Sequence, residues 1–146
     1  MKATHKVYDL PTRVFHWLFV ILFVTAFSIG KFSDDEAPIF SFHMLAGLTL
    51  GVTLFIRVIW GFVGTRHARF FGFSLRPTAL LSYLKGILSG DKTRWAGHNP
   101  ASSWAAIAMM LFAVGLCATG ITMALGSKAD FLGEVHEIFA NSFVIT

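Results

Sequence analysis

The sequence predicts an all-α membrane protein, a four-helix transmembrane bundle whose fourth helix is incomplete. Hydrophobic residues make up 55% of the 146-residue chain and charged residues 14%, whereas soluble domains average roughly 45 to 50% and 25%. The apolar residues also gather in long stretches, as a bilayer requires, because a spanning helix needs about 20 mostly apolar residues. We therefore expect a single transmembrane domain over residues 1–146.

Four apolar segments define the expected helices. They cover about residues 14–30, 43–63, 101–125 and 135–146. The fourth segment is still apolar at Thr146, where the chain stops. At about 1.5 Å per residue it would cross about 18 Å of a hydrocarbon core roughly 30 Å thick. We expect this helix to be cut off inside the membrane.

A further helix is expected in the loop between the second and third segments. The hydrophobic residues of this loop recur at helical spacing: Leu80, Leu81, Leu84, Ile87 and Leu88. Pro77 suits the first turn of such a helix. The helix is predicted to lie along the cytoplasmic membrane surface, and packing against the bundle is the alternative. Asn99 and Pro100 are expected to cap and start the third segment.

The distribution of basic residues predicts the orientation. Lysine and arginine gather before the first segment and from the end of the second to the start of the third: Lys2, Lys6, Arg13, Arg57, Arg66, Arg69, Arg76, Lys85, Lys92 and Arg94. The other two connections hold Lys31 and Lys128 beside acidic residues: Asp34, Asp35, Glu36, Asp130 and Glu134. Because cytoplasmic loops carry an excess of Lys and Arg, we expect a bacterial inner-membrane protein with a cytoplasmic N-terminus. The basic net charge then reflects topology and gives little support to nucleic-acid binding.

Three histidines lie at the ends of apolar stretches: His16, His43 and His136. An ionisable side chain in a bilayer is a functional-site candidate that needs a partner, although a lone histidine at a helix end is often only an interfacial polar residue. The topology puts His43 and His136 near the periplasmic side and His16 near the cytoplasmic side. Two imidazoles at one depth on different helices are what bis-histidine haem ligation requires. We therefore expect haem iron between His43 and His136.

The attachment of such a haem is expected to be non-covalent. The chain has one cysteine, Cys117, and no C-x-x-C-H motif, which excludes covalent c-type attachment. His16 has no visible partner at its depth. A residue about 14 positions after His136 would lie about 21 Å deeper on nearly the same face, but the chain ends before that position.

Four other residues are candidates for contact with the haem or its ligands. Gly47 and Gly51 leave one face of the second segment free for a flat macrocycle, or they serve plain helix packing. Arg57 lies near the cytoplasmic interface, where it meets a haem propionate or acts only as a basic anchor. Glu137 adjoins His136 and is expected to help orient its imidazole.

Five strings spread over nearly the whole chain carry a family resemblance: LPTRVFHW at 10–17, HMLAG at 43–47, RVIWGFVG at 57–64, GHNP at 97–100 and VHEIFAN at 135–141. Together they resemble the bacterial cytochrome b561 family, which includes the b-type cytochrome subunits of nickel-iron hydrogenases. The resemblance implies a four-helix bundle with two b haems that carries electrons between the quinone pool and a periplasmic redox partner.

The family pattern also implies roles for the histidines. His43 and His136 match the two ligands of the periplasm-side haem, and His16 matches one ligand of the cytoplasm-side haem. The second fourth-helix histidine of the family is absent, so the chain is a truncated product or the missing ligand comes from another chain or from water. The number of haems stays open at one or two.

The expected function is therefore haem b electron transfer within the lipid bilayer, between the quinone pool and a periplasmic cytochrome or redox enzyme. Quinol oxidation or quinone reduction near the cytoplasm-side haem would make the carrier an enzyme as well. Two alternatives remain open. One is a cofactor-free membrane anchor subunit of a redox complex, and the other is a transporter that binds a transition metal through the same imidazoles.

Overall fold

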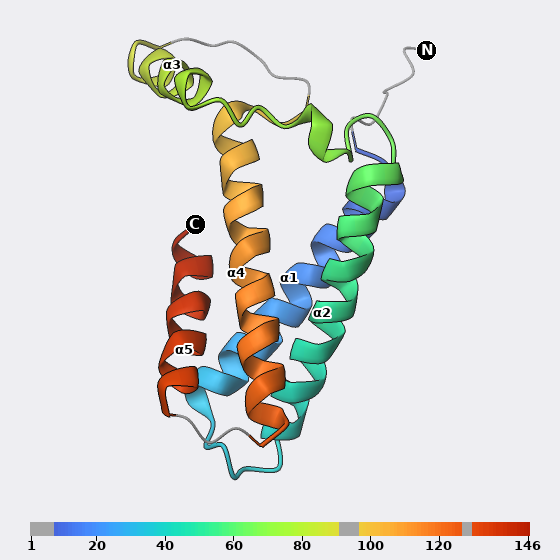
Figure 1. Ribbon diagram of the computed structural model, residues 1–146, viewed down its shortest axis with the longest axis vertical. Coiled ribbons are helices and arrows are strands. Elements are labelled where there is room, and N and C mark those ends of the chain that lie inside the picture. Colours follow the sequence, from blue (N-terminus) through green and yellow to red (C-terminus); the bar gives the residue numbers. More distant parts are fainter. Residues whose placement is uncertain (1–7, 91–96, 127–129) are drawn as a thin grey trace.

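The computed structural model describes residues 8–90, 97–126 and 130–146. All of the regular secondary structure in this part of the chain is helical. The elements are α1 (Leu10–Phe32), α2 (Phe40–Val63), the short 3-10 helix η1 (Phe70–Gly72), α3 (Pro77–Leu88), α4 (Pro100–Ala124) and α5 (Asp130–Ile145) (Figure 1). The predicted all-α class is confirmed. Five basic residues used to predict the orientation lie outside the described residues: Lys2, Lys6, Lys92, Arg94 and Lys128.

Three of the helices, α1, α2 and α4, are long and apolar enough to cross a membrane. Many of their large apolar side chains are exposed, and a bilayer would cover those that face outward. Helix α5 has 16 residues, which at about 1.5 Å each is less than a hydrocarbon core of roughly 30 Å. A complete four-helix bundle therefore stays a prediction.

The helices form two antiparallel pairs that meet through α2 and α4. Helix α1 packs on α2, α5 packs on α4, and α2 packs on α4. Figure 1 shows α5 running beside the half of α4 that is nearer its C-terminal end. The buried core at the meeting of the pairs consists of Phe19, Leu50, Leu54, Ala113 and Phe143.

Helix α3 lies at the end of the molecule where α4 begins (Figure 1). It starts at Pro77 and ends at Leu88, which confirms the helix predicted from the leucine spacing. Its position along a membrane surface stays a prediction. The Asn99 cap is also confirmed, because the Asn99 side chain accepts a hydrogen bond of 2.8 Å from the Ser102 amide at the start of α4.

Asp9 fixes the start of α1 and ties it to the end of α2. Its carboxylate accepts hydrogen bonds from the Thr12 amide (3.0 Å), the Trp60 indole (3.1 Å) and the Thr65 hydroxyl (2.8 Å). Burial alone would raise the pKa of Asp9, but these hydrogen bonds outweigh it and hold the pKa below its ordinary value. Helix α1 therefore begins at Leu10, earlier than hydropathy alone suggests.

We expect the Asp9→Ala substitution to lower the free energy of unfolding by about 0.5 to 2 kcal/mol, as the loss of a helix N-cap does. Because the pKa of Asp9 is lowered in the folded protein, its contribution is present above the ordinary carboxyl pKa of about 3.9 and is lost as the pH falls through the lower folded value. Thermal unfolding in one detergent at several pH values measures both effects. Asp9→Asn, which keeps a capping oxygen, is the control, and equal losses in the two variants would contradict the role of the cap.

Candidate functional site

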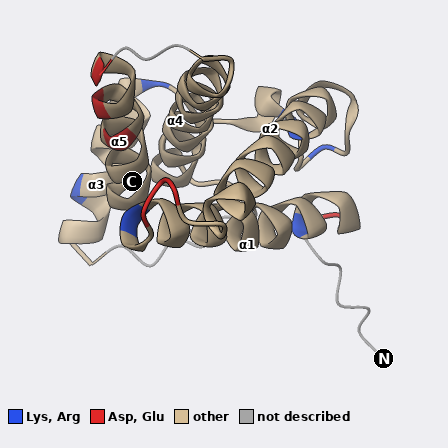
Figure 2. Cartoon of the chain, turned by 90° about the horizontal axis from the view of Figure 1, so that it is seen from below, with Lys and Arg blue, Asp and Glu red and all other residues tan. Residues whose placement is uncertain are grey.

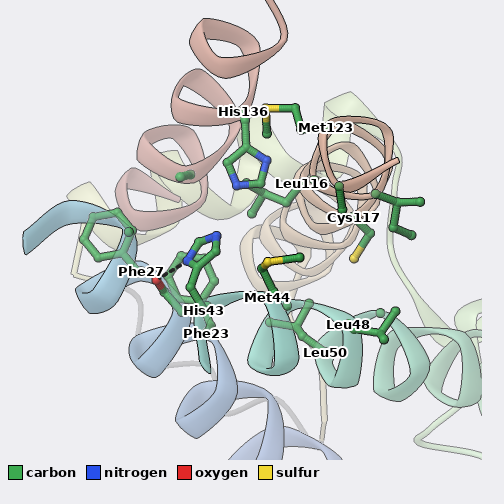
Figure 3. Close-up of a pocket in the computed structure, with 18 of the residues that line it drawn as sticks. Phe23, Phe27, His43, Met44, Leu48, Leu50, Leu116, Cys117, Met123 and His136 are labelled. Carbon is green, nitrogen blue, oxygen red and sulfur yellow. Dashed lines mark hydrogen bonds between the residues drawn. The ribbon is translucent and has the colours of Figure 1, made fainter. Parts of the chain in front are cut away.

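A cavity of about 1140 Å³ lies among α1, α2, α4 and α5, toward the end of the bundle where α1 ends and α5 begins. Apolar side chains from all four helices dominate its wall, among them Phe23, Leu48 and Leu116. His43 and His136 also line it, and their rings point toward one another (Figure 3). The cavity exceeds the 300 to 1000 Å³ that is usual for ligand pockets, so it has room for a large ligand.

The two imidazoles lie at the separation expected for axial ligands of one metal atom. Their ring centroids are 6.1 Å apart and the ring planes are inclined by 63°. A metal-imidazole bond is about 2.0 Å long and the ring centroid lies about 1.1 Å behind the ligating nitrogen, so two opposed ligands have centroids about 6 Å apart. The structure therefore brings together two of the three histidines singled out from the sequence.

The His43 imidazole is held by α1. Its Nδ1 lies 2.8 Å from the carbonyl oxygen of Ala26, and because a carbonyl only accepts, Nδ1 carries the proton. Gly30 makes room for the ring, since a Cβ atom at this position would lie 2.9 Å from Cε1 of His43. Nε2 is thus the ring nitrogen of His43 that is left for coordination.

The His136 imidazole is held in the same way by α4. Its Nδ1 lies 2.7 Å from the hydroxyl oxygen of Thr119. That hydroxyl donates its own proton to the Gly115 carbonyl at 2.8 Å, so its oxygen accepts from Nδ1–H, and Nε2 is the ring nitrogen left for coordination. Gly120 lies against this ring, and a Cβ atom there would be 3.4 Å from Cε1 of His136.

The two glycines expected on one face of α2 have different surroundings. A Cβ atom at Gly47 would meet nothing within 4 Å, and Gly47 borders the cavity. A Cβ atom at Gly51 would lie 3.2 Å from Sγ of Cys117. Gly47 thus keeps space open beside His43, whereas Gly51 also permits the close approach of α2 and α4.

His16 and Arg57 do not line this cavity. His16 is exposed on α1. Arg57 is only 6% exposed, and its guanidinium lies over the rings of Phe15 (5.7 Å) and Phe70 (4.9 Å). Its Nη1 has no hydrogen-bond partner. The structure therefore separates these two residues from the His43 and His136 pair.

Glu137 lies at the cavity wall but does not orient His136. Its carboxylate forms an exposed ion pair with Lys31 at 2.9 Å. The residues that hold the imidazoles are instead Ala26 and Thr119, which the sequence interpretation missed. Ala26 acts through its backbone and carries no side-chain signal, and Thr119 is one of several threonines in apolar stretches. Among the described residues, no group of three or more His, Cys, Asp or Glu could hold a bare metal ion.

Apolar spanning helices with a pair of facing imidazoles beside a large apolar cavity are typical of membrane-embedded helical cytochromes. Comparison with known families agrees with this class. The chain belongs to the prokaryotic cytochrome b561 family, which matches residues 7–146.

Known proteins similar to the chain are named as b-type cytochrome subunits of hydrogenases. The "Probable Ni/Fe-hydrogenase 1 B-type cytochrome subunit" of Escherichia coli (strain K12) is 29% identical over 146 residues, covering 83% of this chain and 60% of the relative. The corresponding subunit of Azotobacter vinelandii is 32% identical over 166 residues, covering 93% and 68%. The chain thus spans about three fifths of the length of the Escherichia coli relative. No solved structure matches the chain significantly.

Close packing of α4 on α5, which carries His136, depends on Gly115. A Cβ atom at this position would lie 2.6 Å from the Phe139 ring. We expect Gly115→Ala to lower the free energy of unfolding of the cofactor-free protein by about 1 to 3 kcal/mol, as overpacking does. Thermal unfolding in detergent is the measurement. Gly47→Ala, where the added carbon meets nothing within 4 Å, is the matched control, and equal effects of the two substitutions would contradict this packing.

Proposed function

We propose that the chain is a haem b electron-transfer protein in which Nε2 of His43 and Nε2 of His136 are the axial ligands. The observation that carries the proposal is the pair of imidazoles whose centroids lie 6.1 Å apart beside the cavity. Haem iron needs only two protein ligands of this kind, whereas a bare metal ion usually takes three or four. Membership of the cytochrome b561 family supports the same cofactor.

The residues around the pair suit this cofactor. The apolar wall, with Phe27 and Met44 beside His43 (Figure 3), would exclude water from the porphyrin. Gly47 leaves space that a side chain would fill. When bound, the haem supplies a one-electron couple between ferric and ferrous iron, and two strong imidazole ligands leave no open position for oxygen chemistry. Both rings are held through Nδ1 by Ala26 and Thr119, which leaves Nε2 of each for coordination.

Helix α5 has one histidine, His136, so the other axial ligand of a second haem at His16 would come from outside this helix. Arg57 supports such a site, because its Nη1 is buried without a hydrogen-bond partner and would be available to a haem propionate. The guanidinium lies beside Phe15, the neighbour of His16 in sequence. We therefore retain His16 and Arg57 as candidates for a second haem site and propose one haem for His43 and His136.

The orientation and the partners complete the proposal. Acidic residues gather in the loop between α1 and α2 and at the start of α5 (Figure 2), and the described basic residues are more frequent toward the opposite end. Because basic residues favour the cytoplasm, the His43 and His136 pair would lie near the periplasmic side of the inner membrane. We propose that electrons pass there to or from a periplasmic redox enzyme, as the names of the hydrogenase relatives suggest, and that a quinone is the other partner.

We expect His43→Ala and His136→Ala each to remove the reduced α-band of the haem that the two imidazoles share, which is the whole band if one haem is bound and about half of it if His16 holds a second. The measurement is the absorbance spectrum of the dithionite-reduced minus the oxidised protein. His67→Ala, outside the cavity lining, is the control and should leave the band unchanged. His16→Ala would remove about half of the pigment if two haems are present. An α-band that neither cavity substitution reduces would contradict the ligand assignment, and a pigment-free wild type that still assembles would favour a cofactor-free anchor.

We expect Gly30→Ala to weaken haem binding by about 10- to 100-fold, as changes next to a metal ligand typically do. The new Cβ atom would displace the His43 ring from Ala26, because it would lie 2.9 Å from Cε1. Titration of the apoprotein with haem measures the affinity. Gly133→Ala is the control, since Gly133 also borders the cavity but its Cβ atom would meet nothing within 4 Å. Equal haem affinities for the two variants would contradict the steric role of Gly30.

A further inference from the structure

We infer that Thr119 is a positioning residue that strengthens His136 as a ligand and thereby lowers the reduction potential of the iron. The inference rests on the proposed haem site. Thr119 is 8% exposed, and its hydroxyl lies between the His136 ring and the α4 backbone. It would touch neither the iron nor the porphyrin and would act only through His136.

The hydrogen bonds at Thr119 form a directed chain. Nδ1–H of His136 donates to the threonine oxygen at 2.7 Å, and the threonine proton goes to the Gly115 carbonyl at 2.8 Å. In such a chain each bond polarises the next, because the hydroxyl becomes a better acceptor when it donates. The Leu116 carbonyl, 3.2 Å from the same hydroxyl, offers a second acceptor for the threonine proton.

This chain changes the electronic character of the ligand. An acceptor on Nδ1–H increases the basicity of the imidazole and fixes its orientation. A more basic axial ligand stabilises ferric iron, which carries the higher charge, more than ferrous iron. The hydrogen bond to Thr119 therefore lowers the reduction potential, and its loss raises it.

The side chain of Thr119 also makes the basicity of the His136 ligand accessible to mutation. The corresponding bond of His43 goes to the backbone carbonyl of Ala26, which a side-chain substitution leaves in place. Within the described residues, Thr119 provides the only side-chain acceptor that is bonded to Nδ1 of either cavity imidazole. The Leu116 backbone is a further hydrogen-bond partner of the His136 ring, so the Thr119 hydroxyl is the part of the support of His136 that a side-chain substitution removes.

Potentiometric titration of the haem-loaded protein tests the inference. Thr119→Val keeps a similar volume but removes the hydroxyl, and we expect an upward shift of the midpoint potential and a loss of haem affinity of about 10- to 100-fold. Thr119→Ser restores the acceptor and should restore the wild-type potential. Thr122→Val is the matched control, because the Thr122 hydroxyl is exposed and donates only to the Ala118 carbonyl of its own helix.

An unchanged or lower potential in Thr119→Val would overturn the inference, as would an equal shift in Thr122→Val. If Thr119→Val does not retain haem, Thr119→Cys decides, because its sulfur is a weaker acceptor and should give a smaller upward shift. An unchanged potential in that variant would also overturn the inference. A wild-type protein that binds no haem would instead refute the proposed function, so the two failures are distinguishable.

Discussion

Each imidazole of the His43 and His136 pair donates Nδ1–H to an acceptor on a neighbouring helix, and this requirement constrains how the helices meet. A polar group buried in an apolar interior is costly unless it is hydrogen-bonded. His43 on α2 is bonded to Ala26 on α1, and His136 on α5 is bonded to Thr119 on α4. Each antiparallel pair of helices therefore carries one histidine together with the acceptor that orients it. The cavity forms where the two pairs meet.

Small residues make these contacts possible. Gly30 and Gly120 lie against the His43 and His136 rings, Gly51 admits the Cys117 side chain, and Gly115 admits the Phe139 ring. At each of these glycines the missing side chain leaves space for a group from another helix. Small residues are the usual means by which helices approach one another closely in membranes. Gly47 differs, because it borders open cavity. The distribution of glycine thus supports both the packing of the helices and the space beside the imidazoles.

Local signals in the sequence predicted much of this fold, whereas most contacts between helices could not be predicted from the sequence. Long apolar segments indicate the spanning helices, and Pro77 and Asn99 mark helix starts because their effect is confined to one turn. The proximity of His43 and His136 followed from alternating helix directions. Thr119 and Ala26 were missed because their roles depend on how α4 faces α5 and α1 faces α2. Glu137 was expected beside the His136 ring, but adjacent helical residues point about 100° apart, and its carboxylate reaches Lys31 instead.

The proposed function requires that His43 and His136 together coordinate one haem iron. Electron paramagnetic resonance of the oxidised, haem-loaded protein tests it directly, because the spectrum reports the number and strength of the axial ligands. Two imidazole ligands should give a low-spin ferric signal, at a stoichiometry of at least one haem per chain. A high-spin ferric signal as the main species, with both histidines intact, would contradict it.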